Sequence, residues 1–263
     1  MKKIVFIVSA LLMLTNETLA FNTFAHQAIT ALTEMNLTDK AKSDVKAILK
    51  GDLQKDCVWL NTLRKKPEME HTKSWHFTQL NSFGKSVTTD ENDGIVQLEN
   101  AIAVLRDRAN HSEALVQESL RKVIHLVQDL HCLSHIYIDG YEGSKGFTYR
   151  IWNEAPGKYS KSWNEKWYNR WESGYAGRYA VFTPQYYAED IDIYANKKKA
   201  EYSTGTPRFW VENAGEDVVR ALEDFYSDNE IPIKITMQYE YLHTKCMAKA
   251  AYRLAALLND IFK

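Results

Sequence analysis

Residues 123–135 read VIHLVQDLHCLSH, so that three histidines and an aspartate lie among aliphatic side chains. His125 and Asp129 are four residues apart, which on a helix places them on one face, about 40° apart around the axis. His135 follows nearly three turns later, about 80° to the other side, whereas His131 falls away from this face and needs no role. The spacing His-x3-Asp-x5-His therefore predicts a centre for more than one metal ion. The alternative is a set of hydrogen-bonded core histidines.

The rest of the chain reads as helices joined by loops. Ile95, Leu98, Ile102 and Leu105 form an amphipathic stripe. Thr38, Ser112 and Thr206 are candidate N-caps, the last with proline at the first helical position. The segments expected to be helical are 25–35, 38–51, 95–108, 112–135, 206–226 and a last helix after Pro232 that includes 252–258. Residues 137–159 are Gly-rich and irregular, and only short strand-like pieces are evident. We predict an all-α, single-domain helical bundle with long irregular loops.

The first 20 residues have the pattern of a secretory signal peptide. A basic start and an apolar stretch at 4–14 are followed by the small residues Thr18 and Ala20. The apolar stretch is too short to cross a membrane. We therefore predict a signal peptide at 1–20, a mature domain at 21–263, and a secreted or periplasmic protein without stable membrane association. An uncleaved anchor is the alternative.

Composition and charge limit the partners that the chain can hold. Hydrophobic residues make up 45% and charged residues 25%, and the net charge is −1. A protein that binds nucleic acid by charge alone is usually basic. In this chain a metal cluster would have to neutralise the negative phosphates of such a substrate. The three cysteines, Cys57, Cys132 and Cys246, are too few for a disulfide scaffold. Export permits one bridge, with Cys57–Cys246 as a candidate pair. Nothing indicates an oligomer, so a monomer is expected.

Two further histidines extend the predicted metal centre. His76 lies in the aromatic segment Ser74-Trp75-His76-Phe77. His26 lies five residues after Phe21, which signal-peptide cleavage would make the mature N-terminus. A free α-amino group and its own carbonyl oxygen can chelate a metal ion. Maturation would then be a condition for building the site.

Together these residues resemble the zinc-dependent single-strand nucleases and 3'-nucleotidases, the nuclease S-one/P-one family, over nearly the whole mature chain. That family resembles the bacterial zinc phospholipases C in fold. Its mature N-terminus and a histidine at position six match Phe21 and His26. Its His-x3-Asp-x5-His helix matches the 125–135 pattern. Its remaining motifs appear here as Trp59-Leu60-Asn61-Thr62-Leu63-Arg64, His76 in a Trp-His-aromatic context, Tyr168-Asn169-Arg170-Trp171-Glu172-Ser173-Gly174 and a final helix with Tyr252-Arg253-Leu254-Ala255-Ala256-Leu257-Leu258-Asn259.

The resemblance implies two or three zinc ions. The ligands it implies are Phe21, His26, Asn61, His76, His125, Asp129, His135 and Glu172. Phe21 and His26 would hold one ion with Asp129, which would bridge to a second ion on Asn61, His76 and His125. The third ion would be held by His135, Tyr168 and Glu172.

Three of the implied positions depart from the family pattern. Asn61 stands where the family has aspartate, so a neutral amide replaces a charged carboxylate. Tyr168 replaces a histidine, and a phenol with an ordinary pKa near 10 is a poor zinc ligand. Glu172 for aspartate keeps a carboxylate. The third site is therefore expected to be weakened, with Cys132 or water as candidate substitutes for the missing ligand.

The resemblance also implies a mechanism and a substrate class. Ions bridged by Asp129 would lower the pKa of a water molecule that attacks phosphorus. Arg64 would contact the phosphate, unless it forms a surface ion pair, and Phe77 would stack on an unpaired base, unless it packs in the core. We predict a hydrolase acting on single-stranded RNA or DNA and 3'-nucleotides. A phospholipase C and a non-catalytic zinc or nucleotide binder are the alternatives.

Overall fold

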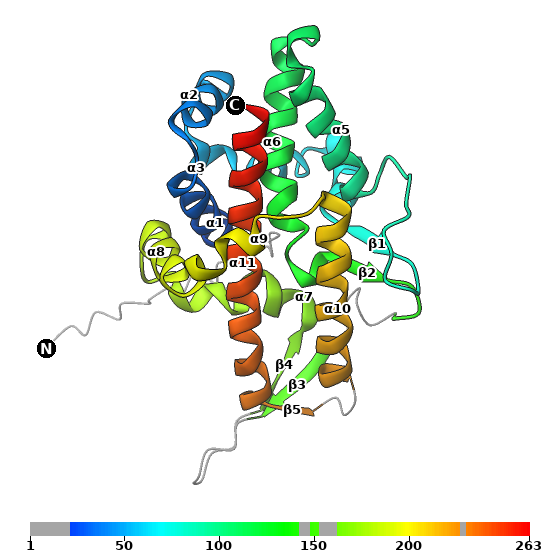
Figure 1. The fold of residues 1–263 in the computed structure, drawn as a ribbon. Coiled ribbons are helices and arrows are strands. Elements are labelled where there is room, and N and C mark those ends of the chain that lie inside the picture. Colours follow the sequence, from blue (N-terminus) through cyan, green and yellow to red (C-terminus); the bar gives the residue numbers. More distant parts are fainter. Residues whose placement is uncertain (1–21, 142–147, 153–161, 227–229) are drawn as a thin grey trace, which may run out of the picture.

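The 29-residue helix α11 (Ile233–Ile261) runs along the middle of the molecule, and the other long helices pack around it (Figure 1). The computed structural model describes residues 22–141, 148–152, 162–226 and 230–263. The predicted signal peptide and Phe21 lie outside these residues. None of the described helices is long and apolar enough to cross a membrane.

The prediction of an all-α fold is confirmed, because helices dominate the described residues. The α-helices are α1 (Thr23–Met35), α2 (Asp39–Leu49), α3 (Leu53–Asp56), α4 (Trp59–Leu63), α5 (Gly94–Arg106), α6 (Glu113–Asp129), α7 (Trp167–Asn169), α8 (Pro184–Ala195), α9 (Lys199–Tyr202), α10 (Pro207–Tyr226) and α11. The 3-10 helices are η1 (Pro67–His76), η2 (Arg108–Asn110), η3 (Leu133–His135), η6 (Ala176–Tyr179) and η7 (Asn196–Lys198), and η5 (Arg170–Gly174) is a π-helical turn.

Local sequence signals explain where several of these helices begin. The side chains of Thr38 and Ser112 accept hydrogen bonds from the backbone N–H groups of Ala41 and Leu115, as predicted for N-caps. Pro207 is the first residue of α10. The second helix ends earlier than predicted, at Leu49, because Lys50 adopts a left-handed conformation with φ 53° before Gly51 is reached.

In the described part of the chain, five short strands add two small sheets to the helices. β1 (Thr78–Leu80) pairs in parallel with β2 (Ile136–Ile138). β3 (Thr148–Trp152) is the central strand of the second sheet, antiparallel to β4 (Ser162–Lys166) and parallel to β5 (Glu230–Pro232). The β1–β2 pair joins the segment after His76 to the segment after His135, so the first sheet fixes two parts of the predicted centre relative to each other.

The expected helix through His135 is wrong, because α6 ends at Asp129. The backbone N–H of Cys132 donates to the carbonyl of Asp129, and that of His135 donates to the carbonyl of Cys132, both at 2.9 Å. These bonds turn the chain, and His135 then lies in the separate turn η3. Helical spacing therefore places His125 and Asp129 correctly but does not describe the position of His135.

A close approach at Gly94 holds the segment that carries His76. The N–H of Gly94 donates to the carbonyl of Phe77 at 2.7 Å. A Cβ atom at position 94 would lie 2.2 Å from the carbonyl oxygen of Trp75, so only glycine fits. The cap of the same helix, Asp93, also accepts a hydrogen bond from the N–H of Gln79 at 3.1 Å. The start of α5 therefore anchors residues 75–79.

The candidate disulfide is not formed. All three cysteines are free and buried, and the thiol of Cys57 donates to the carbonyl of Gln54 at 3.2 Å.

Candidate metal centre

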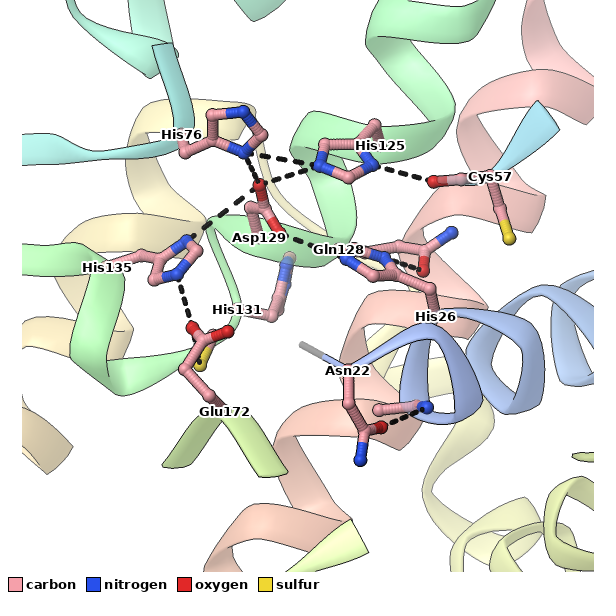
Figure 2. Close-up of polar contacts among 12 residues, drawn as sticks. Asn22, His26, Cys57, His76, His125, Gln128, Asp129, His131, His135 and Glu172 are labelled. Carbon is pink, nitrogen blue, oxygen red and sulfur yellow. Dashed lines mark hydrogen bonds and ion pairs between the residues drawn. The ribbon is translucent and has the colours of Figure 1, made fainter. Parts of the chain in front are cut away.

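Asp129 lies among four buried histidines that come from separate parts of the fold (Figure 2). Its Oδ2 atom is 2.6 Å from His76 Nδ1, 3.0 Å from His125 Nε2 and 3.9 Å from His135 Nδ1. Its Oδ1 atom is 3.4 Å from His26 Nε2. All five side chains are inaccessible to solvent. The fold thus gathers residues from α1, η1, α6 and η3 around one carboxylate.

The hydrogen bond between His125 and Cys57 fixes the orientation of the imidazole. His125 Nδ1 lies 2.6 Å from the carbonyl oxygen of Cys57, which can only accept, so Nδ1 carries the proton. In a neutral imidazole the other nitrogen, Nε2, then directs its lone pair toward Asp129, 3.0 Å away. A backbone carbonyl that orients a metal-binding imidazole in this way is a common partner behind a ligand histidine.

Gln128 orients His26 in the same way. The amide nitrogen of Gln128 donates to the hydroxyl of Thr30 at 3.0 Å, which identifies the other amide atom as the acceptor. His26 Nδ1 therefore donates to Gln128 Oε1 at 2.8 Å. The unprotonated Nε2 of His26 is directed at Asp129, and the His26 ring stacks on that of His125, with centroids 4.4 Å apart.

Two imidazole lone pairs that face one buried carboxylate repel it unless a cation lies between them. Burial lowers the pKa of His26 to about 3 and the pKa of His76 to about 4, so these imidazoles are neutral at pH 7. Burial raises the pKa of Asp129, but the charge that His125 and His135 carry when protonated, together with hydrogen bonds from His125 and His76, outweighs this and holds its pKa well below the usual range. In the described structure, His76 Nε2 has no hydrogen-bond partner. The neutral imidazoles of His26 and His76 beside an ionised carboxylate suit a divalent cation.

A second group of potential ligands adjoins the first. His135 Nε2 lies 2.5 Å from Glu172 Oε1, and Cys132 Sγ lies 3.7 Å from the same oxygen. Ser134 donates to this oxygen at 3.3 Å, and Glu172 Oε2 has no hydrogen-bond partner in the described structure. Burial raises the pKa of Glu172, and the neighbouring His135 partly offsets this effect. Cys132, His135 and Glu172 are fully buried and close enough to share one ion.

Tyr168, which stands where the resembled family has a histidine, packs against the centre with its ring. The rings of Tyr168 and His135 are nearly parallel, at 13°, with centroids 5.8 Å apart. Burial raises the pKa of the Tyr168 phenol above its ordinary value, and the Glu172 carboxylate raises it further. The phenol is therefore protonated, and its ring packs against the imidazole of His135.

Arg64 and the ring of Phe77 lie at the edge of the centre. Arg64 follows the C-terminal end of α4 and is half-buried. Its charge adds to the burial that lowers the pKa of His76 and partly offsets the burial that raises the pKa of Glu172. Among the described residues it has no carboxylate partner, so the alternative of a surface ion pair is not seen. Phe77 is half-buried and stacks on Tyr137, with centroids 5.2 Å apart, so it is not a core residue.

The two remaining predicted ligands are placed less directly. Asn61 is buried on α4, which packs against α6 and η1, the elements that carry His125 and His76. Phe21 lies outside the described residues. Its neighbour Asn22 donates from its backbone N–H to the carbonyl of Glu172 at 2.9 Å, so the described chain starts beside the centre (Figure 2).

Sequence reasoning missed the residues that orient the ligands. Gln128, Thr30 and the carbonyl of Cys57 act through hydrogen bonds between distant segments. The one available signal was the polar Gln128 beside Asp129 in an otherwise apolar stretch of α6. The dismissal of His131 is supported, because it bonds to the carbonyl of Val127 and the guanidinium of Arg253 in the core.

The fold and the centre define a helical protein in which buried carboxylates and histidines are suited to bind metal. The S1/P1 Nuclease family model matches residues 21–263, so the chain belongs to this family. The family implies a nuclease, a hydrolase of phosphodiester bonds in nucleic acids. No curated protein matches the chain.

Proposed function

We propose that the protein is a zinc-dependent nuclease that hydrolyses single-stranded RNA or DNA and 3'-nucleotides. The observation that carries the proposal is the stacked pair His26 and His125, whose Nε2 atoms lie 3.4 Å and 3.0 Å from the two oxygens of Asp129. Gln128 and the carbonyl of Cys57 hold the two Nδ1 atoms, so both Nε2 atoms are turned toward the same carboxylate. The zinc dependence of the family in general supports the same choice of ion.

In this proposal the residues divide into ligands and substrate-binding groups. The ligands are the Phe21 terminus, His26, Asn61, His76, His125, Asp129, His135 and Glu172. Zinc bound there supplies positive charge for the phosphate and lowers the pKa of water. Asp129 holds the cluster together, because both of its oxygens face imidazoles.

The substrate-binding groups follow from the edge of the centre. The guanidinium of Arg64 is free of carboxylate partners among the described residues and suits a phosphate oxygen. Phe77 and Tyr137, stacked on each other beside His135, offer an aromatic surface for a base. A base reaches such a surface only when it is unpaired, which favours single strands. The near-neutral net charge of −1 is compatible with this mode, since the metal ions supply the charge.

The experiment uses protein beginning at Phe21, with single-stranded and duplex oligonucleotides and a 3'-nucleotide as substrates. We expect cleavage of the single strands and phosphate release from the 3'-nucleotide, loss of both with a chelator, and recovery with zinc. His125→Ala is expected to be inactive, and His111→Ala, which changes a histidine outside the centre, is expected to be active. Full zinc loading without turnover of any of these substrates would reject the enzyme and favour a non-catalytic binder.

A further inference from the structure

We propose that the third metal site is a thiolate site, formed by Cys132, His135 and Glu172, in which Cys132 replaces the ligand lost at Tyr168. The site deepens the proposed function, because it rests on the same centre. In this site the thiolate of Cys132 takes the place of the Tyr168 phenol, while the imidazole of His135 and the carboxylate of Glu172 remain as ligands. The ligand atoms of these three residues all lie within 4.8 Å of one another.

The spacing of the three side chains suits a tetrahedral ion. Zinc lies about 2.3 Å from sulfur, about 2.0–2.1 Å from nitrogen and about 2.0–2.2 Å from a carboxylate oxygen, so the tetrahedral ligands of such a site are about 3.3–3.7 Å apart. Cys132 Sγ is 3.7 Å from Glu172 Oε1. His135 Nε2 is 2.5 Å from the same oxygen, so these two atoms would move apart by about 1 Å to admit an ion.

The buried polar atoms of the site point to a ligand independently of the cysteine. Glu172 Oε2 is completely buried and has no hydrogen-bond partner in the described structure. His135 is equally buried, and neither of its ring nitrogens has a hydrogen bond of good geometry in the described structure. Such groups cost free energy unless a partner compensates them. One cation at Cys132, His135 and Glu172 would do so.

The turn after α6 explains why Cys132 reaches a site that the helical spacing did not assign to it. The bonds from Cys132 N–H to Asp129 and from His135 N–H to Cys132 fold residues 129–135 back on themselves. Cys132 and His135 consequently face Glu172 together. The ring of Tyr168 stacks on the imidazole of His135.

The proposed binding step is balanced by release of one proton. The thiol of Cys132 loses its proton to solvent as the sulfur–metal bond forms, without any change of oxidation state. A site with a thiolate selects soft or borderline ions such as zinc and cobalt over magnesium. Serine or aspartate at position 132 would remove that preference.

The test replaces zinc with Co²⁺ in the full mature protein and records the near-ultraviolet spectrum and the metal content. We expect thiolate-to-cobalt charge-transfer absorption in the wild type. Cys132→Ala should lose this absorption and one metal ion per chain. Cys246→Ala, which removes another buried cysteine outside the centre, should keep both. If Cys132→Ala does not fold, Cys132→Ser replaces it, because serine is similar in size and gives no thiolate absorption.

Two results would overturn the inference: a cobalt-loaded wild type without thiolate absorption, or absorption that persists after Cys132 is replaced. Neither of these two spectroscopic results depends on whether the protein is a nuclease. An active nuclease without thiolate absorption would reject only the thiolate site. An inactive protein with the absorption, lost in the Cys132 variant, would support the thiolate site and reject the proposed function.

Discussion

Gln128 Oε1 accepts a hydrogen bond of 2.8 Å from His26 Nδ1, although the two residues lie on different helices, α6 and α1. The neighbouring residue of Gln128 is Asp129, so one turn of α6 supplies both the carboxylate of the centre and the group that orients a histidine toward it. Partners of this kind are as informative as the ligands, because they fix the tautomer in which an imidazole can bind a metal ion.

Replacing Gln128 by methionine is therefore expected to weaken metal binding without removing a ligand. The variant loses the acceptor for His26 and the donor to Thr30, and such partners are worth about 10- to 100-fold in metal affinity. Competition with a chromophoric chelator measures the affinity, and the thermal midpoint reports folding. The matched control is Gln117→Met, which alters another glutamine of the same helix, whose hydrogen bonds go to the carbonyls of Ile48 and Leu49 and to Arg121. Equal zinc affinity in the two variants would contradict the role of Gln128.

Asn61→Asp is expected to have opposite effects on the metal-free and metal-loaded protein. A buried aspartate adds charge that costs stability while no cation is present. With zinc bound, the same charge should raise affinity by about tenfold or more, which is about 1.4 kcal/mol. Thermal midpoints with chelator and with zinc, together with zinc titrations, measure both effects. Asn61→Ala should weaken zinc binding, and an unchanged affinity in both variants would place Asn61 outside the ligand set.

One extra glycine before Phe21 should reduce metal binding. The backbone of Asn22 is held at Glu172, so a longer mature chain displaces the α-amino group by one residue. Metal analysis should show lower occupancy or affinity at the site that contains His26. A glycine added after Lys263, at the other end of the chain, is the control. Unchanged metal content and activity in the N-terminal extension would reject ligation by the terminus.

Phe77→Ala should weaken substrate binding more than metal binding. Stacking of a base on an aromatic ring is worth about 1–3 kcal/mol, so KM for a single-stranded oligonucleotide should rise about 5- to 150-fold. Phe77→Tyr keeps an aromatic surface and should retain most of the affinity. Zinc content should be the same in both. A KM unchanged in Phe77→Ala would mean that the base lies elsewhere.

His243 gives a pH dependence that is separate from the metal centre. It is buried on α11, and its Nε2 donates to the carbonyl of Trp171 at 3.2 Å. Burial lowers its pKa from 6.5 to about 4. Well above pH 6.5 the His243 imidazole is neutral in both the folded and the unfolded protein, so its titration costs no stability. As the pH falls from 6.5 to 4, the unfolded chain takes up a proton that the folded protein excludes, so about 3 kcal/mol of stability is lost.

Urea unfolding of the wild type and of His243→Gln at pH 7.5 and pH 5, both with chelator, measures the free energy of unfolding that is lost when His243 titrates. Glutamine can still donate to Trp171 but does not titrate. Between these two pH values the wild type should lose about 2 kcal/mol more than the variant. Identical losses would show that His243 does not exclude the proton.

The sequence determined those features that depend on neighbouring residues. The caps Thr38 and Ser112 and the position of Pro207 predicted where helices begin, because a cap satisfies N–H groups within its own first turn. The His125–Asp129 spacing predicted a shared face, because both lie within one regular helix. The motifs also indicated the family, which a model match over 21–263 now shows.

The tertiary structure decided which distant residues meet. His135 left the expected helix because the hydrogen bonds at 129–135 turn the chain, and the turn carried Cys132 to Glu172, forty residues away in the sequence. The orientation of His125 depends on the carbonyl of Cys57, which no periodicity reveals. Such contacts form only when the packed helices bring separate segments together. The sequence therefore supplied the candidate ligands, and the packing set the direction in which their lone pairs point.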